Sequence, residues 1–176
     1  MNSEYRDKLG KEAQRIEEDS KYSSKDQYNS SSYWQKIHYG IGIPATFFAV
    51  CAGIITTQKV TPEGTAISIL FSLLTALLTG LLTFLKPHEK ASLHKTSGDK
   101  YLRLRNKARV FHEITIHDED CVPKAIKTQL QEIIKEHDDL ISYSPQPLDS
   151  AYMKTKKGIR NGEATHKVDR KYSKKP

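Results

Sequence analysis

Two long stretches without a charged residue constrain this chain more than any other feature of its sequence. Residues 37–58 contain no Asp, Glu, Lys or Arg, and neither do residues 64–85. Each stretch holds 22 residues, which as a helix would span about 33 Å, slightly more than the ~30 Å hydrocarbon core of a bilayer. Runs of this length predict membrane-spanning helices and disfavour the alternative of two core helices in a soluble protein.

The segment between the two stretches is too short to fold by itself, so together they predict a transmembrane hairpin. We expect it to occupy residues 34–86, with spans at about 37–58 and 64–85. Thr61 is placed to cap the second helix, with Pro62 at its first position. Positive charge follows the second span far more densely than it occurs between the spans, which predicts that both termini are cytoplasmic. The lysines concerned are Lys86, Lys90, Lys95 and Lys100.

The rest of the chain also predicts helices, so the expected fold class is an all-α membrane protein. Residues 1–33 are expected to form a cytoplasmic helix at 3–20, followed by a linker at 21–32 that is rich in Ser and Tyr. Residues 87–143 predict a cytoplasmic helical hairpin, and residues 144–176 a short helix, from about 148 to 160, and a basic tail. Lys86 precedes Pro87, which predicts a break between the second span and the next helix.

Apolar residues recur at helical spacing in both arms of the expected cytoplasmic hairpin. Such stripes must be buried, and we expect them to pack on each other or on a neighbouring subunit. The first stripe contains Ala91, His94, Gly98, Tyr101, Leu104, Ala108, Phe111 and Ile114, and the second contains Ile126, Leu130, Ile133, Ile134, His137, Leu140 and Ile141.

The second span has a face of small and hydroxyl-bearing residues, and the first span has a shorter one. Small residues let helices approach closely in lipid, where Ser and Thr also hydrogen-bond across the contact, so helix packing is one interpretation. The other is that several hairpins form a homo-oligomer whose hydroxyls line a path for ions. The residues are Ser68, Ser72, Thr75, Ala76, Thr79, Gly80 and Thr83 in the second span, and Ala45, Ala49 and Gly53 in the first.

Motifs for catalysis or for a cofactor are not found in the sequence. His112 and His117 flank a glutamate, but their spacing of five does not place them on one helix face as a zinc protease requires. No phosphate-binding glycine loop and no nucleophile motif occur. His94 is interpreted as a packing residue, with a pH-sensitive or ligand contact as the alternative. We therefore expect no enzyme activity, no metal and no cofactor.

The chain carries 28 basic and 21 acidic residues, a formal net charge of +7. Basic residues beside a span are attracted to anionic lipid headgroups, which is the favoured interpretation. A nucleotide ligand is the second alternative, and nucleic acid is less favoured. Cys51 lies at membrane depth and Cys121 far along the cytoplasmic part, so no disulfide is expected.

Residues at the cytoplasmic ends of the spans form a recognisable pattern. Trp34, His38, Gly42 and Pro44 enter the first span, and Pro87, Ala91, His94 and Tyr101 follow the second. This pattern resembles the SLATT family, two-transmembrane proteins named for their association with SMODS nucleotidyltransferases and SLOG domains. Gly162, Glu163, Val168 and Asp169 are similar to the end of some members, although His166 and Lys167 stand where those often have an aromatic residue.

The resemblance implies an effector of bacterial anti-phage conflict systems, located in the inner membrane. Such a protein would remain inactive until a cyclic nucleotide, a nucleotidyltransferase, a SLOG-type protein or another signalling partner reports infection. It would then permeabilise the membrane and arrest or kill the cell, an abortive infection. The alternative from another class is a membrane-anchored helical scaffold that recruits a cytoplasmic partner without forming a pore.

Overall fold

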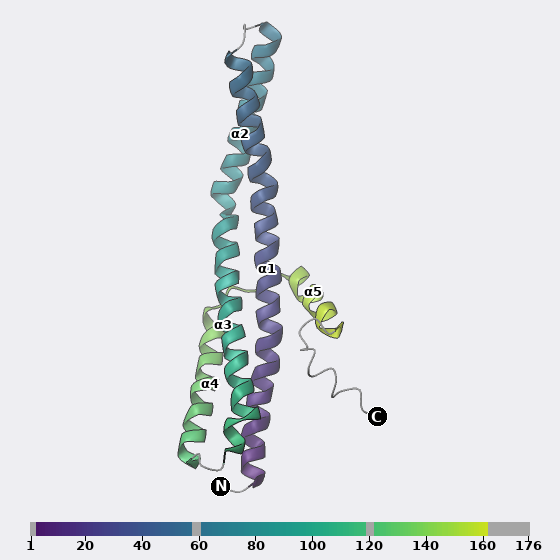
Figure 1. Ribbon diagram of the computed structural model, residues 1–176. Coiled ribbons are helices and arrows are strands. Elements are labelled where there is room, and N and C mark those ends of the chain that lie inside the picture. The colour runs from purple at the N-terminus through teal and green to yellow at the C-terminus, as the bar shows by residue number, and fades with distance from the viewer. Residues whose placement is uncertain (1–2, 58–60, 119–121, 162–176) are drawn as a thin grey trace. The chain divides into compact units, whose positions relative to one another are not determined.

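The computed structural model describes residues 3–57, 61–118 and 122–161, and every regular element in these ranges is helical. The elements are α1 (Ser3–Thr57), α2 (Pro62–Leu85), α3 (Pro87–Glu113), a 3-10 turn η1 (Thr115–His117), α4 (Pro123–Tyr143) and α5 (Asp149–Arg160) (Figure 1). The predicted all-helical class is confirmed for these ranges. The basic tail at 162–176, with its four family-like positions, and Cys121 lie outside the described residues.

Contacts between residues divide the chain into two compact units. Residues 31–92 form the first, which we call the hairpin unit, and residues 1–30 together with 93–176 form the second, the bundle unit. Both α1 and α3 contribute residues to each unit.

In the hairpin unit, α2 lies antiparallel beside the C-terminal half of α1 (Figure 1). The two helices pack through small residues and one aromatic pair. Ala45 and Ala52 of α1 are buried, and the ring centres of Phe48 and Phe71 are 5.4 Å apart. Both helices are long and apolar enough to cross a membrane.

Both ends of α2 have the local structure that the sequence predicts. Thr61 is the N-cap, and its hydroxyl accepts a hydrogen bond of 3.2 Å from the backbone N–H of Gly64. At the other end, Lys86 adopts a left-handed conformation with φ of 47°, and its N–H bonds to the carbonyl of Leu82. The right-handed helical region is disfavoured for a residue before proline, and at Lys86 the helix ends: α2 stops there and Pro87 begins α3.

The bundle unit has its own apolar core, contributed by the N-terminal part of α1 together with α3 and α4. The stripes predicted in residues 87–143 are largely buried, but α1 is a third partner in their packing, in addition to the mutual contact that was expected. Ile114 and Ile141 are exceptions, because both side chains are exposed. The core contains Ala13, Ile16, Tyr101, Leu104, Ala108, Phe111, Ile116, Ile126, Leu130, Ile133 and Leu140.

The linker predicted at residues 21–32 is wrong, because α1 continues through it without a break. Polar residues occupy the inward face of the helix there. Ser20, Ser24 and Gln27 continue the stripe begun by Ala13 and Ile16 at spacings of three and four residues, and all are buried. A helix whose buried face is polar lacks the apolar periodicity on which the prediction depended.

Candidate functional site

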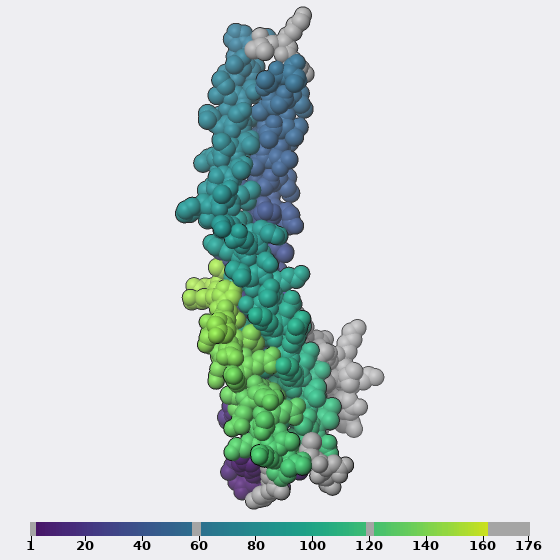
Figure 2. All heavy atoms as spheres, turned by 90° about the vertical axis from the view of Figure 1, so that its left-hand side faces the viewer, coloured from purple at the N-terminus to yellow at the C-terminus, as the bar shows by residue number. Residues whose placement is uncertain are grey.

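The hairpin unit exposes large apolar side chains along both of its helices. No residue of α2 is fully buried, and the ring of Phe84 is 86% exposed. Figure 2 shows α1 and α2 side by side here, with their side chains at the surface that faces the viewer. A soluble protein would bury such residues, so this surface favours contact with lipid or with further copies of the chain. The exposed residues include Ile43, Phe47, Val50, Ile54, Ile67, Ile69, Leu70, Leu73, Leu77 and Leu81.

Two members of the small and hydroxyl face of α2 point to α1 within the same hairpin. Ser68 donates to the carbonyl of Ala52 at 3.2 Å and lies 2.9 Å from the hydroxyl of Thr56. Thr75 lies 3.5 Å from the carbonyl of Ala45. These contacts join the two helices, so Ser68 and Thr75 act in packing inside the hairpin.

The remaining members of this face form an exposed stripe that no helix of the hairpin covers. The hydroxyls of Ser72 and Thr83 donate to carbonyls of their own helix, four residues earlier, at 2.9 and 3.0 Å. Gly80 has no atom within 4 Å of the position a Cβ would take. We call this set the α2 stripe: Ser72, Ala76, Thr79, Gly80 and Thr83.

The small stripe predicted on the first span divides in a similar way. Ala45 is buried against α2, whereas Ala49 and Gly53 are exposed. Ala52, which the prediction left out, takes the second buried position. Each step of four residues rotates by about 40° around a helix, so a stripe with strict four-residue spacing turns away from the contact between α1 and α2. Residues seven apart, such as Ala45 and Ala52, stay on the side that faces α2.

Four of the residues in the family-like pattern lie at the beginning of α1's apolar stretch. The ammonium of Lys90 stands 4.3 Å from the ring centre of Trp34, and the rings of His38 and His88 are 5.4 Å apart. Leu82 lies 3.7 Å from the position that a Cβ on Gly42 would take, which is an ordinary contact. Pro44 lies inside α1, where its missing N–H leaves the carbonyl four residues earlier without its helical donor.

The other four positions of that pattern follow α2. Pro87 and Ala91 are buried in the hairpin unit, where the hydroxyl of Ser31 donates to the carbonyl of Ala91 at 2.8 Å. Tyr101 and His94 are buried in the bundle unit, Tyr101 as part of the apolar core. These buried positions therefore have packing roles in the described structure.

His94 belongs to a chain of buried hydrogen bonds in the bundle unit. Its Nδ1 lies 2.6 Å from Oε1 of Gln27, whose Nε2 donates to the carbonyl of Pro145 at 2.7 Å. Because the amide nitrogen of Gln27 is the donor to Pro145, its oxygen must accept, and His94 therefore presents Nδ1–H. Burial lowers the pKa of His94, which favours the neutral ring with its proton on Nδ1.

A second group of buried polar residues holds the chain that follows α4. Ser30 accepts a hydrogen bond from the backbone N–H of Leu148 at 3.1 Å, and Asn29 donates to the hydroxyl of Thr155 at 2.9 Å. Thr155 also hydrogen-bonds Asp26, although burial is the larger influence and raises the pKa of Asp26. One carboxylate oxygen of Asp26 is buried without a hydrogen-bond partner.

A close approach of α1 and α3 adjoins these polar contacts. The hydroxyl of Tyr28 lies 2.6 Å from a carboxylate oxygen of Asp99; burial and this neighbour raise the pKa of Tyr28 to about 12. A Cβ on Gly98 would lie 3.1 Å from the ring of Tyr28 and 3.3 Å from the carbonyl of Ser24. Glycine is needed here for space, not for an unusual backbone conformation.

We call the hydrogen-bonded polar residues that join α1 and α3 to the chain after α4 the buried polar network. Its members are Asp26, Gln27, Asn29, Ser30, His94 and Thr155. The sequence predicted His94 alone among them. The recurrence of Ser20, Ser24 and Gln27 in register with the apolar residues before them is the signal that would have revealed the others, once the helix was known to continue. The network connects α1 and α3 to residues 145–155 through Gln27, Ser30, Asn29, Asp26 and Thr155.

His112 and His117 do not form a metal site in the described structure. Nε2 of His112 lies 2.7 Å from a carboxylate oxygen of Glu17, and Arg105 lies 3.8 Å from the other oxygen of that group. Within the described ranges no three His, Cys, Asp or Glu residues are grouped as metal ligands would be. His112 therefore joins α1 and α3 through its hydrogen bond with Glu17.

Comparison with family models, curated proteins and solved structures found no match to this chain.

Proposed function

We propose that this protein is a membrane-permeabilising effector that acts as a homo-oligomer. The observation that carries the proposal is the α2 stripe: five small or hydroxyl-bearing residues on one face of an apolar helix, left uncovered by the hairpin. Apolar burial does not drive helices together in lipid, whereas small residues and hydroxyls do so through close contact. An uncovered face of this kind therefore favours a second copy of the chain.

One hairpin cannot enclose a path for ions, so permeabilisation requires several. In the proposed assembly the α2 stripes of neighbouring hairpins face one another around the path. Ser72 and Thr83 keep acceptor lone pairs after bonding their own helix, and Thr79 adds a third hydroxyl on the same face. Hydroxyls and carbonyls can partly replace the hydration of an ion. A lining without charge would discriminate poorly among ions.

The bundle unit is proposed to receive the activating signal. Its buried polar network holds residues 145–155 by hydrogen bonds, which break when the partners move apart by a short distance. Binding of a ligand or partner to these residues would therefore change the contacts of α1 and α3. Such a signal acts only if it binds the active and resting states with different affinity. Following the SLATT resemblance, we propose the bacterial inner membrane as the location, cytoplasmic termini, and a nucleotide signal or partner enzyme reporting phage infection as the trigger.

The experiment is a toxicity assay in cells together with dye leakage from vesicles carrying the purified protein. Thr79→Leu combined with Thr83→Leu adds bulk to the α2 stripe and should abolish both toxicity and leakage at equal membrane abundance. Ala66→Leu is the matched control, because Ala66 is exposed on the bulky face of the same helix. Equal activity of the double variant and the control would refute the role of the stripe.

A membrane-anchored scaffold is the second candidate, favoured by the groove between α3 and α4. This groove has a volume of about 560 Å³, and charged and amide side chains line it beside Val110 and Ile133, a surface that a partner of complementary charge could contact. Its lining includes Arg103, Lys107, Val110, Glu132 and Glu136. Replacing both spans with an unrelated transmembrane hairpin separates the candidates, because a scaffold would keep its function and a permeabilising effector would lose it.

A further inference from the structure

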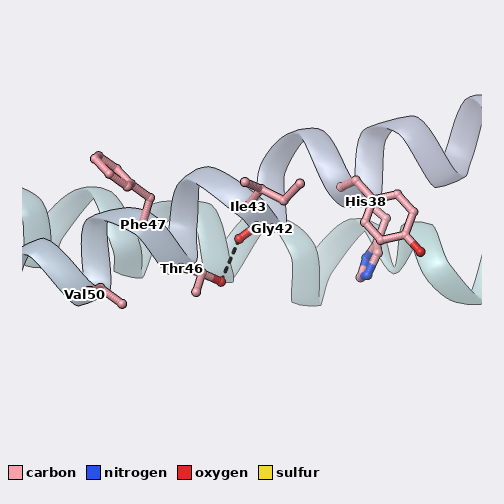
Figure 3. A pocket seen from close by; sticks show the side chains of 7 residues that line it. His38, Gly42, Ile43, Thr46, Phe47 and Val50 are labelled. Atoms are coloured by element: carbon pink, nitrogen blue, oxygen red, sulfur yellow. Dashed lines mark hydrogen bonds between the residues drawn. The ribbon is translucent and has the colours of Figure 1, made fainter.

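A shallow groove follows the outer face of α1 in the hairpin unit (Figure 3). Its volume is about 560 Å³. Gly42 and Thr46 form its low floor, and Ile43 and Phe47 stand beside them as a ridge. Tyr39, four residues before Ile43, also lines the groove and extends that row. Both rows have four-residue spacing, which is the spacing that generates ridges and grooves on a helix surface.

The groove has one polar end and one apolar end. His38 and Tyr39 lie at the first, and Val50 lies at the other. Thr46 brings the one hydroxyl on the floor, and it donates to the carbonyl of Gly42 at 3.0 Å, so its proton is already used (Figure 3). From residue 38 to residue 50 a helix rises about 18 Å, close to half of a ~30 Å hydrocarbon core. An acyl chain within one leaflet has this length and needs no polar partner.

The segments of the hairpin unit nearest in sequence to His38 and His88 carry a net positive charge. Residues 31–41 and 86–92 of the hairpin unit contain Lys36, Lys86 and Lys90 against the single acid Glu89, so three positive charges and one negative leave a net charge of +2. Glu89 is 3.3 Å from Lys86 and pairs with it. Lys90 instead lies over the ring of Trp34, and Trp34 is one helical turn before His38. Near the opposite end of the hairpin the sequence has Lys59 and Glu63, whose charges balance.

We propose that this groove binds a phospholipid with an anionic headgroup, its phosphate beside His38, His88 and Lys90 and one acyl chain along Gly42 and Thr46. The neighbouring imidazoles of His38 and His88 offer N–H donors and Lys90 supplies a charge, while the flanking Ile43 and Phe47 contact the chain. The occupant is a lipid of the leaflet at the lysine-rich end. The inference rests on the membrane placement in the proposed function, and not on permeabilisation.

The experiment is native mass spectrometry of the full chain in detergent, titrated with phosphatidylglycerol and with phosphatidylcholine carrying the same acyl chains. A lysine near a surface contributes enough for about a fivefold preference for the anionic lipid. Lys90→Gln should remove that preference, whereas Lys127→Gln, the same charge change on the exposed face of α4, should retain it. Phe47→Ala should weaken both lipids alike, and Phe84→Ala, an exposed phenylalanine outside the groove, should weaken neither.

Equal binding of the two lipids by the unmodified protein would overturn the inference, and so would equal losses in a variant and its matched control. Leakage from vesicles does not depend on whether the groove binds a lipid. A protein that permeabilises vesicles but binds both lipids equally would therefore refute lipid binding in the groove and leave the proposed function standing. A chain that stays in aqueous solution without detergent would refute both.

Discussion

Replacement of Gln27 by leucine tests whether the buried polar network holds the bundle unit together. The side chain of Gln27 is 2% exposed, and leucine of similar size cannot make either of its hydrogen bonds. The change leaves the Pro145 carbonyl and the Nδ1–H of His94 without their partner, at a cost of about 1–3 kcal/mol each. Burying the apolar leucine offsets part of this cost. We expect a net loss of about 3 kcal/mol, which lowers Tm by roughly 6–12 °C.

Thermal unfolding in mild detergent, followed by circular dichroism, measures the change, and hydrogen exchange locates it. Amides of residues 145–155 should exchange about a hundredfold faster, because 1.4 kcal/mol corresponds to a factor of ten. Gln14→Leu is the matched control, since Gln14 is exposed on the same helix. If Gln27→Leu melts within about 1 °C of that control, the two hydrogen bonds contribute nothing net and the reasoning fails.

Three further predictions concern the same unit. Gly98→Ala should cost about 1–3 kcal/mol, because its Cβ would lie 3.1 Å from the ring of Tyr28; Gly53→Ala, with nothing within 4 Å, should not destabilise the fold in the same melting assay. Burial lowers the pKa of His94, so the unfolded chain binds its proton first, and stability should fall by up to about 1.4 kcal/mol per pH unit as the pH drops below about 6.5; the unfolding free energy of His94→Gln, measured across that range, should lack this loss. Burial raises the pKa of Asp26, so Asp26→Asn should raise Tm at neutral pH, and the gain should disappear in acid, where the carboxyl takes up its proton.

The sequence predicted the parts of the fold that depend on residues close together in the chain. The length of each uncharged stretch predicted its helix, the Thr61 and Pro62 pair predicted where α2 begins, and Pro87 predicted the break at Lys86. Each of these three features depends on local sterics or on the length of a segment. None of them requires knowledge of what packs against the helix.

Contacts between distant residues could not be predicted in the same way. The continuation of α1 through residues 21–32 depends on burial of Ser24 and Gln27 against groups some 70 to 120 positions later, such as His94 and Pro145. Serine and glutamine have no intrinsic preference for the buried face of a helix, so the composition of residues 21–32 predicted a linker. The division of the hydroxyl face likewise depends on which side of α2 meets α1, which only the pairing of the two helices fixes.

The hydroxyls that bond their own helix have a consequence for how the protein is made. Thr46, Ser72 and Thr83 each donate to a carbonyl four residues earlier, so in the proposed membrane placement each hydroxyl proton would enter the bilayer already hydrogen-bonded. A hairpin leaving the ribosome would therefore need no second subunit to be inserted, and newly synthesised copies could accumulate singly in the membrane. In the proposed function, assembly would then be a step that follows biosynthesis.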